Sequence, residues 1–229
     1  VPVLLRAYDA LPAGDARRTR LAEPVDILRR WDFRWDTSSV ATTVAMFWGE
    51  RLGALGASGS RMGARERDPA QTSQERLAAS ATPDQLLQAL VDATDRLVRD
   101  FGRWQTPWGE VNRFQRLTGD IVHPFDDAKP SIPVGFTHGN WGSLASFAAA
   151  PRRGSKKWYG TSGNSFVAVV EFGDRLKAKA VTAGGLNSVP GSKHFNDQAE
   201  RYATGNLRDV YFYREDLKGH IEREYKPGQ

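Results

Sequence analysis

A short apolar segment, a turn and an alternating segment constrain the fold of this 229-residue chain most strongly. Phe166–Phe172 is apolar except for Glu171, Gly173-Asp174-Arg175 follows, and Leu176–Thr182 then alternates apolar residues with lysines. Turn residues between two such runs predict an antiparallel β-hairpin. A strand that is apolar on both faces is typical of the centre of a sheet. A strand that alternates apolar and polar residues is typical of a sheet with one face exposed to solvent. We therefore expect the first strand at the centre of a sheet and the second nearer its edge.

The composition is that of a folded protein, and it excludes several kinds of site. Forty per cent of the residues are apolar, which excludes a wholly disordered chain. The net charge of +5 comes from 32 basic and 27 acidic residues scattered along the sequence, so no nucleic-acid partner is expected. The absence of cysteine excludes disulfides and thiolate metal sites. The longest uncharged stretch, Pro130–Pro151, is interrupted by proline and glycine, so no membrane span is expected.

Three short helices are predicted ahead of a polar segment. Their apolar spacing places them at Val3–Leu11, Val25–Trp31 and Thr42–Leu55, the second with Pro24 as its opening residue. Residues 53–81 are then rich in Gly, Ser, Arg and Gln with little periodicity, which predicts a mobile surface excursion.

The clearest helix follows that segment. Thr82-Pro83-Asp84-Gln85 offers an N-cap, a first-turn proline and a capping-box glutamine, and Gly102 is a suitable end. The residues between them form one apolar stripe, which predicts a packing role. Residues 102–155 are aromatic and rich in Pro and Gly, and such segments often frame a site on a larger body. Apolar pockets need such walls, so we expect Trp108 and Trp141 to border an apolar pocket.

The C-terminal third is predicted to continue with four further elements. Gly160–Ser165 is expected to form a tight turn leading into the apolar strand. A helix is expected over Lys193–Ala203, with Ser192 as its N-cap. A strand over Asp209–Tyr213 and a charged helix over Arg214–Glu224 follow.

Glu171 is the first candidate for chemistry. A carboxylate at the end of a buried apolar strand must be paired, hydrogen-bonded or shifted in pKa. The alternative interpretation is a structural cross-strand ion pair with Lys177 or Lys179. The four histidines show no metal-ligand spacing, so no metal site is predicted within the chain.

Three pieces of this sequence carry a resemblance to a known family. They are KWYGTSGNSFVAVVEF at Lys157–Phe172, HFNDQAERY at His194–Tyr202 and RRWD at Arg29–Asp32. Together they resemble the C-terminal part of the β subunit of the penicillin acylase family. The members of this family are N-terminal-nucleophile (Ntn) hydrolases. The resemblance implies an α+β fold, part of a four-layer αββα sandwich with antiparallel sheets. Residues 1–229 would be a C-terminal portion of that subunit, which is cut from a precursor.

The resemblance also implies roles for particular residues. Glu171 would orient a histidine on a companion chain, next to that chain's N-terminal serine nucleophile. This chain begins Val1-Pro2-Val3, so the serine is expected elsewhere. Asn164 would lie near the substrate, and Trp108 and Trp141 would wall the pocket for its acyl group. His194, Asp197 and Gln198 are expected to form a structural network that holds the last helix on the sheet.

The implied activity is removal of an acyl side chain from an N-acyl substrate through a serine acyl-enzyme. Acyl-homoserine lactones, β-lactams and lipopeptides all fit the family, with quorum quenching or antibiotic conversion as the outcome. No cofactor is expected in this chain, although a structural calcium ion on the missing part fits the resemblance. The implied location is periplasmic or secreted. The alternative is a non-catalytic module that binds a ligand or completes a fold.

Overall fold

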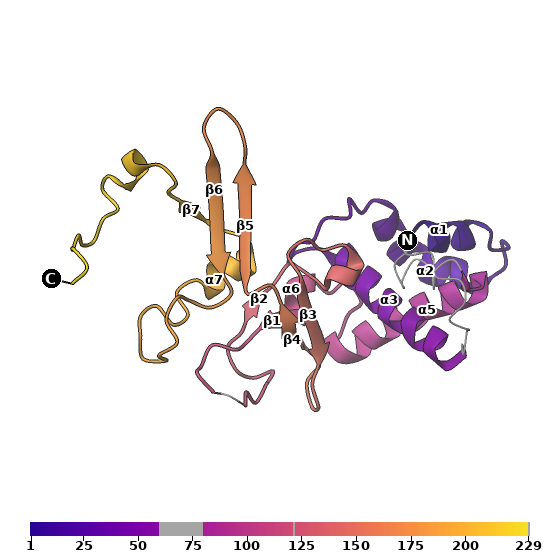
Figure 1. The fold of residues 1–229 in the computed structure, drawn as a ribbon. Helices are drawn as coiled ribbons and strands as arrows, with labels where there is room; N and C mark the ends of the chain where they lie inside the picture. Colours follow the sequence, from indigo (N-terminus) through magenta and orange to yellow (C-terminus); the bar gives the residue numbers. More distant parts are fainter. Residues whose placement is uncertain (60–79, 121, 229) are drawn as a thin grey trace. The chain divides into compact units, whose positions relative to one another are not determined.

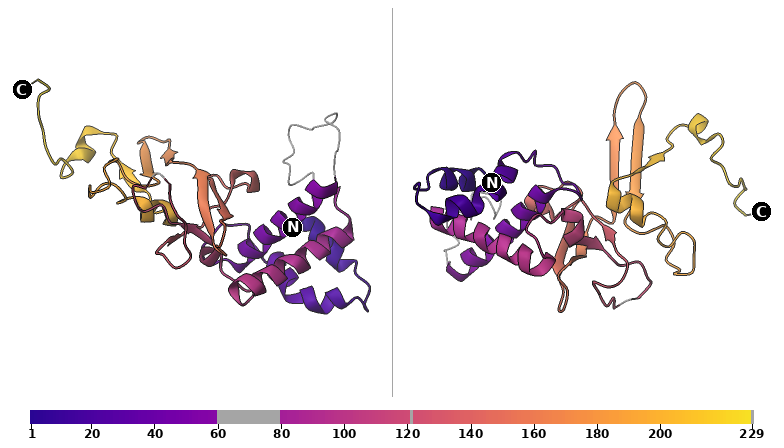
Figure 2. Two further views of the ribbon diagram at one scale, coloured as in Figure 1. Left: turned by 90° about the horizontal axis from the view of Figure 1, so that it is seen from below. Right: turned by 180° about the vertical axis from the view of Figure 1, so that it is seen from behind.

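The computed structural model describes residues 1–59, 80–120 and 122–228. The ribbon is shown in Figures 1 and 2. The chain is a mixed α+β protein in which most strand pairs are antiparallel, so the predicted fold class is confirmed. Within the described ranges, no helix is both long and apolar enough to cross a bilayer.

The chain forms two compact units, which we call the helical unit and the hairpin unit. The helical unit comprises Val1–Gln115 and Pro124–Gly163. The hairpin unit comprises Arg116–His123 and Asn164–Gln229.

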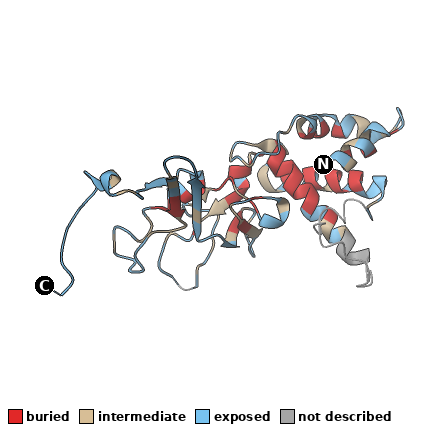
Figure 3. Ribbon diagram, turned by 45° about the horizontal axis from the view of Figure 1, so that its top comes forward, coloured by how far each residue is buried: buried red, intermediate tan, exposed pale blue. Residues whose placement is uncertain are grey.

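Four helices build the core of the helical unit. They are α1 (Pro2–Asp9), α2 (Ala16–Arg29), α3 (Val40–Gly59) and α5 (Pro83–Phe101). Figure 3 shows buried residues concentrated along these packed helices. The α3 and α5 helices pack against each other, and the Trp48 indole N–H on α3 donates to the Leu86 carbonyl on α5 at 3.0 Å.

The second helix begins earlier than predicted. Asp15 is the N-cap, and its Oδ1 accepts from the Arg17 backbone N–H at 2.9 Å. Pro24 therefore lies inside α2 rather than opening it. Leu21 and Val25 are buried on this helix, so core packing outweighs the hydrogen bond that proline cannot donate.

The third helix extends into the predicted surface excursion. It continues to Gly59, so the prediction of an irregular segment is wrong for residues 53–59. Leu52, just before this stretch, is 3% exposed and anchors the helix in the core. Residues 60–79 of the predicted excursion lie outside the described residues.

The boundaries predicted for α5 agree with the structure. The Thr82 Oγ1 accepts from the Gln85 backbone N–H at 3.2 Å, and the Gln85 Oε1 accepts from the Thr82 backbone N–H at 2.9 Å. Gly102 ends the helix in the left-handed region, with φ of 82°. Local capping chemistry thus fixes both ends of this helix.

Thr82→Ala should lower the free energy of unfolding of the helical unit by about 1 kcal/mol, because the Gln85 N–H loses its side-chain acceptor. Urea unfolding measures this change. Thr82→Ser keeps the hydroxyl and serves as the control. A loss of the same size in Thr82→Ser would contradict a capping role.

A small mixed sheet completes the helical unit. Its strands are β1 (Asn112–Phe114), β2 (Ile132–Pro133), β3 (Phe147–Pro151) and β4 (Trp158–Gly163), in the order β2-β1-β4-β3. The β1–β4 pair is parallel and the others are antiparallel. Two short helices, α6 (Trp108–Val111) and η1 (Gly139–Trp141), precede β1 and β3.

The predicted turn at Gly160–Ser165 is largely wrong, because residues up to Gly163 belong to β4. Phe147 pairs with Gly163 in the antiparallel β3–β4 ladder. A β-carbon at Gly163 would fall 2.4 Å from the Ser146 carbonyl oxygen. The glycine therefore permits close backbone approach within a strand, where the sequence pattern indicated a turn.

The hairpin unit contains the predicted β-hairpin. Its elements are β5 (Phe166–Glu171), β6 (Lys177–Thr182), α7 (Ala199–Thr204), β7 (Arg208–Val210) and η2 (Arg214–Leu217). Antiparallel pairing of β5 with β6 confirms the hairpin, with Glu171 opposite Lys177.

The predicted positions of the two hairpin strands in the sheet are reversed. The order is β5-β6-β7, so β6 is central and β5 is an edge strand. Phe166 is 58% exposed and Val169 62% exposed, which shows that β5 is not covered within the described residues of this unit. The apolar sequence of β5 therefore indicates a strand that needs a cover from outside the unit.

The last two predicted helices are shorter than expected. Residues before α7 form turns, in which the Ser192 Oγ accepts from the His194 backbone N–H at 3.1 Å. The α7 helix ends at Gly205, which has φ of 70°. The predicted charged helix is reduced to the single 3₁₀ turn η2, because Lys218 is extended.

Candidate functional site

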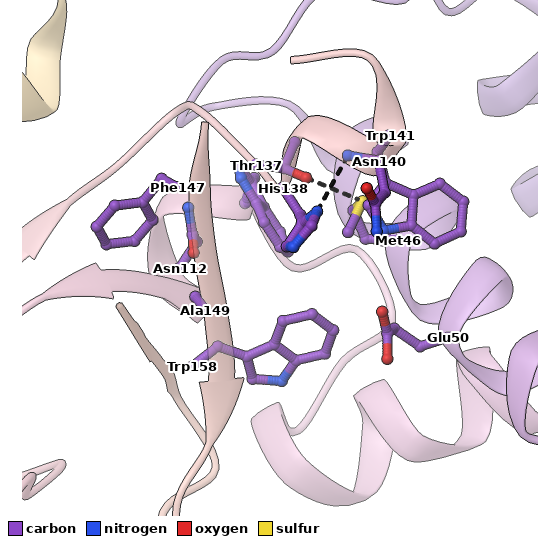
Figure 4. Close-up of a pocket in the computed structure, with 11 residues that line it drawn as sticks. Met46, Glu50, Asn112, Thr137, His138, Asn140, Trp141, Phe147, Ala149 and Trp158 are labelled. Carbon is purple, nitrogen blue, oxygen red and sulfur yellow. Dashed lines mark hydrogen bonds between the residues drawn. The ribbon is translucent and has the colours of Figure 1, made fainter. Parts of the chain in front are cut away.

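A cavity of about 130 Å³ lies within the helical unit, between α3, the start of the small sheet and the 137–141 loop (Figure 4). Its walls combine tryptophan and phenylalanine rings with a similar number of polar side chains. The lining residues are Met46, Glu50, Trp108, Asn112, Thr137, His138, Asn140, Trp141, Phe147, Ala149 and Trp158. An apolar pocket with a few convergent polar groups is the usual form of a small-molecule site.

Both tryptophans that the sequence singled out border this cavity. Trp108 is 1% exposed and meets the Trp158 ring edge-on, with ring centroids 5.7 Å apart. Trp141 lies against α3 at Gly49, where a β-carbon would fall 2.1 Å from the Trp141 ring. Gly49 thus leaves the space that Trp141 occupies. Their role in binding an acyl group stays a prediction.

Three buried polar atoms of the lining residues have no hydrogen-bond partner among the described residues. They are Asn112 Oδ1, Trp108 Nε1 and Trp158 Nε1. The Asn112 Nδ2, in contrast, donates to the Val134 carbonyl at 2.8 Å and to the Phe136 carbonyl at 2.7 Å. Buried polar atoms are usually satisfied, so these three atoms are exceptions among the described residues.

Two titratable residues at the cavity were not predicted from the sequence. Glu50 lies on α3, and its carboxyl group borders the cavity. Although the residue is exposed overall, partial desolvation of the carboxyl group raises its pKa, and the charges of Arg96 and His138 oppose this shift. The His138 Nδ1 accepts from the Asn140 backbone N–H at 3.0 Å, which places the proton of the neutral ring on Nε2. No sequence pattern marks either residue, since segments far apart in the chain bring them together.

Glu171 lies in the hairpin unit, beside a groove of about 440 Å³ over the sheet. Its side chain is 70% exposed, and its Oε1 lies 3.8 Å from the Lys177 Nζ. The cross-strand ion pair considered as the alternative is therefore present. An exposed pair of this kind contributes little to stability. The role of Glu171 in orienting a companion histidine stays a prediction.

The three residues expected to form a structural network divide into two contacts. The His194 Nδ1 lies 2.8 Å from the Asp197 Oδ2, and both side chains are partly exposed. The Gln198 Oε1 accepts from the Thr182 backbone N–H on β6 and from the Arg208 Nε on β7, each at 3.2 Å. Gln198 is 5% exposed, so it links the N-terminal end of α7 to two strands.

Gln198→Leu should lower the free energy of unfolding of the hairpin unit by about 1–3 kcal/mol, because two donors lose their acceptor. Hydrogen exchange at the Thr182 amide measures the local change. Asp197→Asn, at a partly exposed position of the same turn, should change stability by less than about 0.5 kcal/mol. Equal effects of the two substitutions would contradict the role given to Gln198.

Asn164 is exposed and comes shortly before β5 in the hairpin unit. Its predicted contact with substrate stays a prediction. In the described part of the chain, no group of three or more His, Asp or Glu residues is arranged to hold a metal ion.

Two comparisons relate the chain to known proteins. The family model described as penicillin amidase matches residues 2–219. A solved structure, thermostable penicillin G acylase from Alcaligenes faecalis in orthorhombic form, aligns with a TM-score of 0.43 and 13% sequence identity. That alignment covers 98% of this chain and 45% of that chain, so the chain spans less than half the length of that relative. Because the family model matches nearly the whole of this chain, the chain belongs to the penicillin amidase family.

Proposed function

We propose that this chain is part of an amidohydrolase that removes the acyl group from an N-acyl substrate through a serine acyl-enzyme. The observation that carries the proposal is the penicillin amidase match over residues 2–219. The nucleophilic serine is proposed to lie on a companion chain, as the resemblance implies.

The exposed hairpin supports the existence of a companion. Phe166, Val169 and Phe172 are 58%, 62% and 83% exposed, and among the described residues β5 pairs with a strand on one side only. Leaving such apolar surface and a free strand edge in water favours association. We propose that the companion part of the enzyme covers this surface and brings its histidine to Glu171.

The proposed chemistry balances in two steps. The serine hydroxyl gives its proton to the N-terminal amine and attacks the amide carbonyl, the C–N bond breaks, and the amine leaves with that proton. Water then splits the serine ester and releases a carboxylic acid. Glu171 would accept a hydrogen bond from the companion histidine and hold its ring in one orientation.

The substrate class is proposed from the family alone. Acyl-homoserine lactones, β-lactams with acyl side chains and acylated peptides are the candidates. A periplasmic or secreted location is proposed on the same basis.

Hydrolysis of a substrate panel tests the proposed function. The enzyme purified from its natural source is incubated with a phenylacetyl amide, an aliphatic acyl-homoserine lactone and an acyl lipopeptide. At least one should yield amine and carboxylic acid in equal amounts. Saturable binding without hydrolysis across the panel would favour the non-catalytic binding module instead.

A further inference from the structure

The cavity of the helical unit is bordered by one acidic side chain, Glu50, on which Arg96 and His138 act electrostatically without a direct ion pair. Glu50 forms no ion pair with any described residue, whereas many other acidic side chains in the described ranges are paired with arginine. The nearby Arg96 is already engaged, because its Nε lies 3.3 Å from the Asp100 Oδ2 and its guanidinium lies over the Phe47 and Trp158 rings, 5.0 and 5.9 Å from their centroids. A carboxyl group beside apolar walls therefore remains available to an incoming cation.

The walls around this carboxyl group suit a cation as well. Trp141, Trp158 and Phe147 border the same space, and aromatic faces attract ammonium groups. Figure 4 shows the Glu50 side chain extending from α3 toward the space that Trp158, Met46 and His138 border. Asn112 adds a second unsatisfied acceptor, since its buried Oδ1 has no partner among the described residues.

The cavity also offers donors. The indole N–H groups of Trp108 and Trp158 have no acceptor among the described residues, although the two side chains are 1% and 3% exposed. Both nitrogens are buried, so a ligand oxygen would satisfy one of them only if the neighbouring side chains moved to admit it. The volume of about 130 Å³ restricts such a ligand to a few heavy atoms.

We propose that this cavity binds a small primary ammonium compound that also carries an oxygen acceptor. The ammonium group would bind between the Glu50 carboxylate and the aromatic faces, and Asn112 Oδ1 would accept one of its hydrogens. The oxygen would accept from a tryptophan indole N–H. The assignment does not depend on the proposed amide hydrolysis, since all of its residues lie in the helical unit.

A comparison of two probes of equal size tests the assignment. Protonated 2-aminoethanol and neutral 1,2-ethanediol have the same number of heavy atoms and differ in one charged group. Each is titrated at pH 7 into the assembled enzyme labelled with ¹⁵N at tryptophan, and the indole resonances of Trp108 and Trp158 are followed. We expect saturable shifts, with 2-aminoethanol binding about tenfold or more tightly than the diol.

Two variants make the result specific. Glu50→Gln should bind the two probes with about equal affinity. This variant is expected to fold, because burial raises the pKa of Glu50 and so disfavours its ionised form in the folded state. Glu23→Gln, at an exposed position of α2 outside the cavity, should leave the preference unchanged.

Three outcomes would overturn the proposal. Equal affinity for the two probes would mean that the cavity does not recognise charge. Absence of any saturable shift would mean that it holds water alone. A preference that survives Glu50→Gln would place the cation elsewhere.

Discussion

Glu171→Gln in the assembled enzyme is expected to lower kcat by about 100-fold or more, with little change in KM or in thermal stability. The amide keeps the size of the side chain but removes the negative charge that would stabilise the companion histidinium. Stability should be unaffected, because the side chain is 70% exposed and its ion pair with Lys177 is long at 3.8 Å. Steady-state kinetics and a thermal unfolding curve on the same preparation measure both quantities.

Lys177→Gln is the matched control for this prediction. It removes the partner of the same ion pair and leaves the Glu171 carboxylate in place. A positioning role predicts activity close to that of the unchanged enzyme in this variant. Equal losses in both variants would indicate that only the ion pair matters. Full activity in Glu171→Gln would remove Glu171 from the mechanism and leave the family membership intact.

Leu90→Ala is expected to lower the free energy of unfolding of the helical unit by about 2–5 kcal/mol. Leu90 is 0% exposed on α5, within the core that this helix shares with α3. Truncation removes buried methyl groups and leaves a cavity that the neighbouring helices fill only in part. Urea unfolding followed by tryptophan fluorescence measures the change.

Val98→Ala, on the same helix, is the control for this substitution. Val98 is 48% exposed, so its truncation should cost less than about 1 kcal/mol. Similar costs at the two positions would contradict the assignment of Leu90 to the core.

The parts of the fold that local chemistry determines were predictable from the sequence. Thr82 and Gln85 cap α5 through contacts only three residues apart, and Gly102 ends that helix by its own backbone freedom. The β5–β6 hairpin follows likewise from two short runs and the turn between them. Such features need no knowledge of the rest of the chain.

Other features depend on packing between distant segments and were not predictable in this way. The pattern of β5 shows that a cover is needed, but only the structure shows that the hairpin unit does not supply it. Pro24 suggested a helix start, yet the Asp15 cap and buried Leu21 extend α2 upstream. The cavity combines Glu50, Asn112 and His138 from three separate segments, and no sequence motif links them.

The decisive measurement is labelling of the enzyme from its natural source with a serine-reactive sulfonyl fluoride. Intact-mass analysis and N-terminal sequencing of every chain then show which chain carries the label. The division of the active site between segments predicts one adduct, on the N-terminal serine of a companion chain. Activity should be lost while the mass of this chain stays unchanged. An adduct on this chain, or hydrolysis by a preparation that contains no chain with an N-terminal nucleophile, would contradict it.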